Sequence, residues 1–257
     1  MVRPAEPEDG CAWITGASSG IGRALALKLA GRGWHVVVSA RRRAELDALA
    51  NEAGNGRVTP WPLDVTDAGA VTAAVDEIER TQAPIALAVL NAGTHQPMSA
   101  QAFEAGVIQK LLTLNVMGAA NALEPLLQRM RPRGAGQVAI VSSVAGYRGL
   151  PTAAAYGASK AAVINMAESL RPELEPEGVL LQVVNPGFVK TPLTERNTFK
   201  MPMLMDVDKA AEALASGLRR RRFEIIFPRL FCWFVKIYRC LPYALALRLA
   251  TRMRPKP

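Results

Sequence analysis

The chain has 257 residues, half of them apolar and 21% charged, and this composition excludes a disordered or collagen-like protein. The net charge of +9 is concentrated at the end of the chain, because residues 219–257 contain 11 Lys or Arg and a single acid. That basic end is also rich in apolar and aromatic residues, which argues against a nucleic-acid-binding surface.

Short apolar runs alternate with amphipathic stretches from residue 11 to residue 227. Strands are expected over residues 11–14, 35–39, 57–63, 85–90, 137–141, 179–184 and 223–227. Helices are expected over residues 21–30, 44–53, 68–80, 103–131, 154–174 and 207–218. Because the strands are apolar nearly throughout, both of their faces should be buried. The pattern predicts an α/β fold: a doubly wound, Rossmann-like parallel sheet of about seven strands, with helices on both faces.

Residues 1–228 contain no linker, repeat or low-complexity segment, so we expect one Rossmann-type domain followed by a basic amphipathic tail over residues 229–257. The first ten residues lack the apolar stretch of a secretory signal, and no uncharged apolar run is long enough to span a bilayer. Cys11, Cys232 and Cys240 are odd in number and form no C-x-x-C pair. A cytoplasmic protein with no catalytic metal is therefore expected.

The sequence TGASSGIG lies directly between the first expected strand and the first expected helix. Glycines at this point allow a tight turn and let the backbone approach a pyrophosphate, which the helix N-terminus then binds. Alone, such a pattern indicates a simple helix start about as often; its position after a buried strand favours a dinucleotide site. The expected cofactor contacts are Gly16, Ser18, Ser19, Gly20, Ile21 and Gly22.

The second expected strand is followed by Arg41 and Arg42, where an NAD-selective fold would usually place an acid. Guanidinium groups offer paired donors to a 2′-phosphate, so NADP(H) is expected rather than NAD(H). The alternative is a solvated helix start, since Arg43 and Glu45 continue the polar run.

Tyr156 and Lys160 are four residues apart at the start of a long expected helix, which puts both side chains on one face. A neighbouring ammonium favours the phenolate and lowers the pKa of a tyrosine, so Tyr156 becomes a usable proton donor. Ser143 follows the fifth expected strand, where ligands bind in parallel sheets. By itself this spacing more often indicates an ordinary surface pair.

Taken in order, these motifs make the sequence resemble the short-chain dehydrogenases/reductases, in particular their NADP-preferring members of about 250 residues. The matching residues are Thr15 to Gly22, Asp64-Val65, Asn91-Ala92-Gly93, Asn115, Ser142-Ser143, Tyr156, Lys160, Pro186-Gly187 and Thr191. The sequence departs from the family at Leu90, where a second asparagine is common, and at Ser19, where some NADP-binding members carry a basic residue. The NADP preference thus depends on the two arginines alone.

The resemblance implies four catalytic residues. Tyr156 would exchange a proton with the substrate oxygen, Ser143 would hydrogen-bond that oxygen, and Lys160 would lower the pKa of Tyr156 and hold the nicotinamide ribose. Asn115 would hold a water that relays protons through the lysine. Further cofactor contacts are implied for Asp64, Val65, Asn91, Ala92, Gly93, Pro186, Gly187, Val189 and Thr191. Relatives form dimers or tetramers, so a homo-oligomer is expected.

Two short helices are expected in the tail, over residues 230–240 and 243–252. Their apolar faces should carry Phe231, Trp233, Phe234, Ile237, Leu245 and Leu249. Lys236 and Arg239 share one side of the first helix, as do Arg248 and Arg252 of the second. Two interpretations are open: the faces contact a membrane surface, or they pack on the protein itself or on a partner subunit.

We therefore expect an NADP(H)-dependent oxidoreductase that transfers a hydride between the nicotinamide and a carbonyl or alcohol substrate. The tail and the methionines at 201–205 favour an apolar, lipid- or steroid-like substrate, although those methionines could equally be ordinary packing. The alternative is a catalytically silent NADP(H) sensor, or a peripheral membrane protein on the same fold.

Overall fold

Seven parallel strands form a single sheet in the computed structural model, which describes residues 2–54, 56–196, 199 and 201–253. The strands are β1 (Cys11–Thr15), β2 (Val36–Ala40), β3 (Val58–Pro62), β4 (Ile85–Leu90), β5 (Gly136–Val141), β6 (Val179–Pro186) and β7 (Glu224–Phe227). Their order across the sheet is β3-β2-β1-β4-β5-β6-β7, and every neighbouring pair is parallel. The predicted fold class is confirmed.

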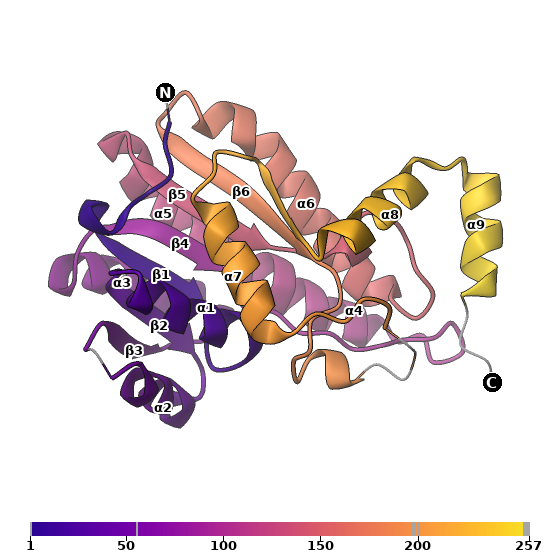
Figure 1. Ribbon diagram of the computed structural model, residues 1–257, viewed down its shortest axis with the longest axis horizontal. Coiled ribbons are helices and arrows are strands. Elements are labelled where there is room, and N and C mark those ends of the chain that lie inside the picture. Colours follow the sequence, from indigo (N-terminus) through magenta and orange to yellow (C-terminus); the bar gives the residue numbers. More distant parts are fainter. Residues whose placement is uncertain (1, 55, 197–198, 200, 254–257) are drawn as a thin grey trace.

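Helices cover both faces of the sheet (Figure 1). One face packs against α1 (Gly20–Gly31), α2 (Arg43–Ala53) and α7 (Val207–Leu218). The other face packs against α3 (Ala68–Thr81), α5 (Gly118–Arg133) and α6 (Ala154–Leu174). In β1, Ala12 and Ile14 belong to the first core, whereas Cys11 and Trp13 belong to the second. Burial on both faces explains why the strands are continuously apolar.

The expected helical region over residues 103–131 is interrupted. It consists of α4 (Ala105–Leu112), the π-helical turn η2 (Thr113–Met117) and α5. Single π turns inside α-helices are frequent at functional sites, and this one contains Asn115. Three short 3₁₀ turns complete the body: η1 (Pro7–Asp9), η3 (Val144–Gly146) and η4 (Thr194–Arg196).

The two expected tail helices are present as α8 (Arg229–Cys240) and α9 (Tyr243–Arg252), and α9 stands apart from the sheet and its helices (Figure 1). The predicted tail extends to residue 257, and its residues 254–257 lie outside the described part of the chain. Across the residues that the structure describes, no helix combines the length and apolarity needed to cross a membrane.

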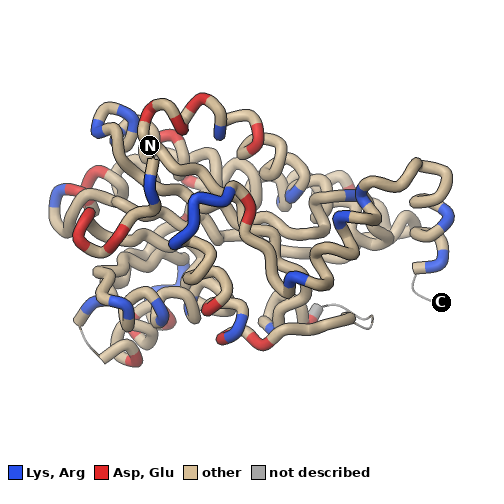
Figure 2. The backbone as a smooth tube through the Cα atoms, turned by 45° about the horizontal axis from the view of Figure 1, so that its top comes forward, with Lys and Arg blue, Asp and Glu red and all other residues tan. Residues whose placement is uncertain are grey.

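The basic residues near the end of the chain lie in two separate places. Residues 219–222 are four consecutive arginines that precede β7 at its amino end, whereas α8 and α9 follow its carboxyl end. Figure 2 shows these arginines as one blue segment well away from α9. The cause is β7 itself, which divides the basic residues between opposite edges of the sheet.

Candidate active site

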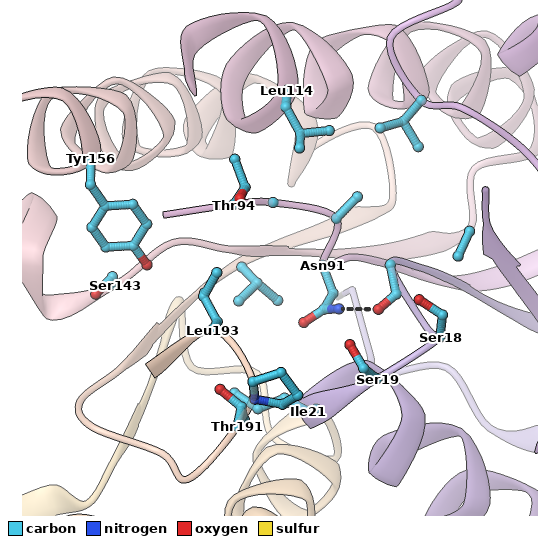
Figure 3. A pocket seen from close by; sticks show the side chains of 18 of the residues that line it. Ser18, Ser19, Ile21, Asn91, Thr94, Leu114, Ser143, Tyr156, Thr191 and Leu193 are labelled. Carbon is cyan, nitrogen blue, oxygen red and sulfur yellow. Dashed lines mark hydrogen bonds between the residues drawn. The ribbon is translucent and has the colours of Figure 1, made fainter. Parts of the chain in front are cut away.

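A cleft of about 900 Å³ runs along the carboxyl ends of the central strands (Figure 3). The connecting loops bring residues from the ends of six strands, β1 to β6, to this edge, which is where ligands bind in doubly wound sheets. All of the predicted site residues line the cleft except Gly22 and Asn115. Both exceptions lie next to lining residues: Gly22 is packed against Asn91, and Asn115 hydrogen-bonds Thr94.

The glycine turn forms one end of the cleft. Gly16 and Gly20 have φ values of +67° and +57°, which residues with a side chain rarely adopt. A Cβ on Gly22 would stand 2.5 Å from the Asn91 Nδ2 atom, so only glycine lets the turn close. Asn91 Nδ2 in turn donates to the main-chain oxygens of Thr15 and Gly16. The first turn of α1, which starts at Gly20, therefore borders the cleft.

Thr15 is a supporting residue whose role the sequence did not reveal. Its hydroxyl oxygen accepts hydrogen bonds from the backbone N–H groups of Asn91 (3.1 Å) and Ala92 (3.2 Å). These bonds tie the end of β1 to the end of β4, so the two cofactor loops are held together. The signal available in the sequence for this supporting role was a polar residue, Thr15, at the end of an otherwise apolar strand.

The two arginines lie at the same end of the cleft and are exposed. Arg42 donates to the Ser18 hydroxyl (3.2 Å) and also pairs with Glu45 at 2.5 Å. The backbone N–H of Thr66 lowers the pKa of Asp64, with a smaller contribution from the charge of Arg41. Both guanidinium groups thus border the cleft. Arg42 also pairs with Glu45, as in the polar helix start that we considered as the alternative.

Tyr156 and Ser143 lie side by side at the other end (Figure 3). Burial raises the pKa of Tyr156, and the neighbouring Ser143 hydroxyl acts in the opposite direction. The Ser143 oxygen accepts from the Ala145 N–H at 3.2 Å. Ser142 faces away, because its hydroxyl donates to the main-chain oxygen of Lys160 (2.8 Å). Of the two serines, Ser143 is therefore the one placed beside the phenol.

Lys160 is buried on the same face of α6. Its Nζ donates to the main-chain oxygen of Val141 at 2.8 Å and lies 5.8 Å from the centre of the Tyr156 ring. Burial lowers the pKa of Lys160 to about 8. Burial is the largest influence on the pKa of Tyr156 in this structure, and the Lys160 ammonium is turned toward Val141.

Asn115 lies in the π turn, and three hydrogen bonds hold its side chain. Its Oδ1 accepts from the Thr94 N–H (2.8 Å), and its Nδ2 donates to the Thr94 oxygen (3.0 Å) and to the Ser159 hydroxyl (2.9 Å). A Cβ on Gly93 would stand 3.1 Å from Asn115 Oδ1 and 3.4 Å from Lys160 Nζ. The missing side chain of Gly93 leaves room where these two polar groups converge.

Other residues at the site were not predicted. The cleft is also lined by Thr66, Thr94, Gln109, Lys110, Leu114 and Leu193. His95 meets Tyr156 edge-on, with ring centres 4.6 Å apart. These residues come from loops, from α4 and from the π turn, where no local pattern distinguishes a lining residue from a solvated one.

Comparison with known proteins identifies the family. The model of the short chain dehydrogenase family matches residues 10–201. A curated relative from Myxococcus xanthus, called an uncharacterized oxidoreductase, is 40% identical over 245 residues, which are 95% of this chain and 97% of the relative. A short-chain dehydrogenase from Sphingobium yanoikuyae, solved in complex with NADPH, is 30% identical with a TM-score of 0.77, covering 91% of this chain and 97% of that one.

The fold is also shared with a short chain dehydrogenase/reductase from Burkholderia phymatum, solved in complex with NAD. It is 23% identical with a TM-score of 0.83, covering 98% of this chain and 99% of that one. The chain belongs to the short-chain dehydrogenases/reductases, and the resemblance seen in the sequence is confirmed. It is an oxidoreductase of a family that acts on small molecules with a nicotinamide cofactor. The residues present fit such a cofactor, because the glycine turn and the tyrosine–lysine pair lie at opposite ends of one cleft.

Proposed function

We propose that the protein is an NADP(H)-dependent oxidoreductase that interconverts a carbonyl compound and its alcohol. The observation that carries the proposal is the shared cleft: Ser143, Tyr156 and Lys160 line the same cavity as the glycine turn and the arginine pair. When bound, the nicotinamide supplies or accepts a hydride at the substrate carbon. The residues of the chain provide the proton and the orientation.

Tyr156 is proposed to donate its phenolic proton to the carbonyl oxygen during reduction and to take it back during oxidation. Ser143 is proposed to donate a hydrogen bond to the same oxygen, which stabilises the charge that develops there. The adjacent positions of the two hydroxyls support this assignment (Figure 3). The raised pKa of Tyr156 keeps the phenol protonated and ready to act as an acid.

Lys160 and Asn115 are proposed to resupply that proton. With a pKa of about 8, Lys160 can lose and regain a proton near neutral pH. The room beside Gly93 is bordered by both Lys160 Nζ and Asn115 Oδ1, which suits a relaying water. We further propose that Lys160 holds the nicotinamide ribose and, once its ammonium is turned from Val141 toward the cleft, lowers the pKa of Tyr156.

The preference for NADP(H) is proposed from Arg41 and Arg42. Related structures contain NADPH in one case and NAD in another, so the preference is argued from the local chemistry. Both guanidinium groups border the cleft beside Ser18, and the sequence has no acid where an NAD-selective fold would place one.

The remaining contacts are proposals that follow from the same site. Asp64, Val65, Asn91, Ala92 and Gly93 would contact the adenosine half of the cofactor. The nicotinamide half would contact Pro186, Gly187, Val189 and Thr191.

The substrate is proposed to be apolar, a lipid- or steroid-like carbonyl or alcohol. Leu114 and Leu193 line the cleft, and the neighbouring loop exposes Met203 and Leu204.

We propose further that residues 1–228 carry out catalysis and that the chain forms a homodimer or homotetramer. The exposed free thiol of Cys240 supports a reducing, cytoplasmic location, with residues 229–257 contacting a membrane surface.

A Tyr156→Phe variant tests the proposed chemistry. It keeps the ring and removes only the hydroxyl, so NADPH binding should remain while turnover falls by about 10²- to 10⁴-fold. Tyr243→Phe is the matched control, because this phenol is exposed on α9 and does not line the cleft. Full turnover by Tyr156→Phe would contradict the assignment, and cofactor binding by fluorescence titration separates lost chemistry from lost folding.

A further inference from the structure

The helix α8 has two chemically different faces. Its inner face carries Phe231, Cys232 and Tyr238, of which the last two are buried. The ring of Phe231 lies 5.2 Å from that of Phe188, and its Cδ1 lies 2.6 Å from where a Cβ on Gly187 would stand. This face therefore packs on the end of β6, beside the cleft. Phe231, which we expected on the apolar face of this helix, thus packs on the protein itself, one of the two interpretations left open.

A partly buried ion pair fixes the helix to the sheet. Lys236 of α8 pairs with Glu224 of β7, which also accepts a hydrogen bond from Tyr147 and one from Asn185 Nδ2 (2.7 Å). Lys236 is thus turned toward the protein. With this pair and the Phe231 contacts in place, α8 has one defined orientation relative to the cleft.

The outer face of α8 is an exposed apolar stripe. It consists of Leu230, Trp233, Phe234 and Ile237, each more than half exposed. Their spacing of three and four residues places them in one row along the helix. The row includes a tryptophan, which is favoured where an apolar phase meets water. A continuous exposed apolar row of this kind marks a surface that binds a protein or a membrane.

The second helix, α9, adds further exposed apolar residues and positive charge. It exposes Leu245 and Leu249 together with Arg248 and Arg252. Arg148 holds the turn between the helices by donating to the main-chain oxygens of Arg239 (2.7 Å) and Leu241 (2.6 Å). From residue 225 onward the sequence contains no Asp or Glu. Figure 2 shows only blue charged positions along these two helices.

The charge pattern selects among possible partners. Two copies of this chain packed through the same face would bring like charges together, because a two-fold interface pairs a surface with itself. Anionic phospholipids neutralise the arginines while the aromatic and aliphatic side chains enter the boundary between headgroups and acyl chains. A nucleic acid would satisfy the charges but leave the apolar stripe in water.

We infer that the outer face of α8 and α9 docks in the plane of an anionic phospholipid bilayer. This assignment rests on the proposed membrane contact and names its lipid class and its surface. Because the inner face packs beside Gly187 and Phe188, docking holds one wall of the cleft next to the bilayer. An apolar substrate dissolved in the membrane then has a short path to Tyr156.

Vesicle flotation with the full chain tests the inference without cofactor or substrate. Phosphatidylcholine vesicles containing phosphatidylglycerol should bind the protein, and salt should weaken that binding. Leu230→Ser/Phe234→Ser should reduce partitioning by about tenfold or more, whereas Phe103→Ser, an equally exposed apolar position outside the tail, should not. Arg248→Gln/Arg252→Gln should remove the preference for anionic vesicles, and Lys28→Gln/Lys209→Gln should keep it.

A second measurement identifies the face. Lipids with brominated acyl chains should quench the fluorescence of Trp233. Trp233→Phe should abolish that quenching, because Trp13 and Trp34 are buried in the body and the partly buried Trp61 lies on β3, at the opposite edge of the sheet from β7. No binding to anionic vesicles would overturn the inference. Stripe variants that leave vesicle binding unchanged and alter only the mass of the assembly in solution would also overturn it and would assign the face to a second copy. Turnover of water-soluble carbonyls is independent of vesicle binding, so failure here leaves the proposed chemistry intact.

Discussion

The burial of Lys160 predicts a conflict between stability and activity. Lowering the pKa from 10.5 to about 8 corresponds to about 3 kcal/mol against the charged form at pH 7, at about 1.4 kcal/mol for each pH unit. Lys160→Met removes this penalty with a side chain of similar length. The lost hydrogen bond to Val141 offsets about 1 kcal/mol. The variant should therefore be more stable than the natural protein by about 2 kcal/mol and should lose turnover.

The pH dependence separates this cause from ordinary repacking. Below pH 8, Lys160 is charged in both the folded and unfolded chain, so the penalty is fully present. Between pH 8 and 10.5 the unfolded chain still holds the proton that the folded protein has lost, and the stability of the natural protein rises. At pH 10 about 1 kcal/mol of penalty is left, so the advantage of the variant should nearly vanish.

Urea unfolding of the cofactor-free proteins at pH 7 and pH 10 measures these differences. Lys209→Met is the control, because Lys209 is exposed and its replacement should change neither value appreciably. Two results would refute the reasoning about burial: a Lys160→Met variant less stable than the natural protein at pH 7, or one whose gain in unfolding free energy is the same at pH 7 and pH 10.

Two further substitutions probe the cofactor end of the cleft. Arg42→Ala should weaken NADPH binding by about tenfold, the value of one charge-assisted contact, and leave NADH binding unchanged. Arg43→Ala does not touch the cleft and should alter neither affinity; a matching loss for NADH would contradict the 2′-phosphate role. Gly22→Ala should lower the free energy of unfolding by about 2 to 4 kcal/mol and impair cofactor binding, because its Cβ would meet Asn91 Nδ2 at 2.5 Å. Gly31→Ala has open space around it and should be neutral or slightly stabilising by thermal unfolding; equal losses in both variants would exclude the clash as the cause.

The elements best predicted from the sequence are those with long, unmixed patterns. Both β4 and α6 begin and end at the expected residues, because burial on one or two faces imposes a clear period. The cleft could be anticipated for a related reason. Ser143, Asn91 and the glycine turn each follow the carboxyl end of a parallel strand, so the topology alone brings them to one edge.

Features that depend on tertiary contacts could not be predicted. The π turn around Asn115 changes hydrogen bonding without changing the apolar period, so residues 103–131 look like one helical region. The pattern of α8 shows apolar residues all around, and only the positions of Gly187 and Glu224 decide which side packs. The pKa of Tyr156 depends on where the Lys160 ammonium points, which spacing along a helix does not specify.

The central claim is NADPH-linked chemistry at Tyr156, and a single steady-state assay tests it most directly. NADPH oxidation is followed against a series of ketones of increasing chain length, with the natural protein and Tyr156→Phe measured side by side. The account predicts turnover with NADPH that rises with apolar length and falls by at least about 10²-fold in the variant. Tight NADPH binding without turnover of any carbonyl, or a clear preference for NADH, would contradict it.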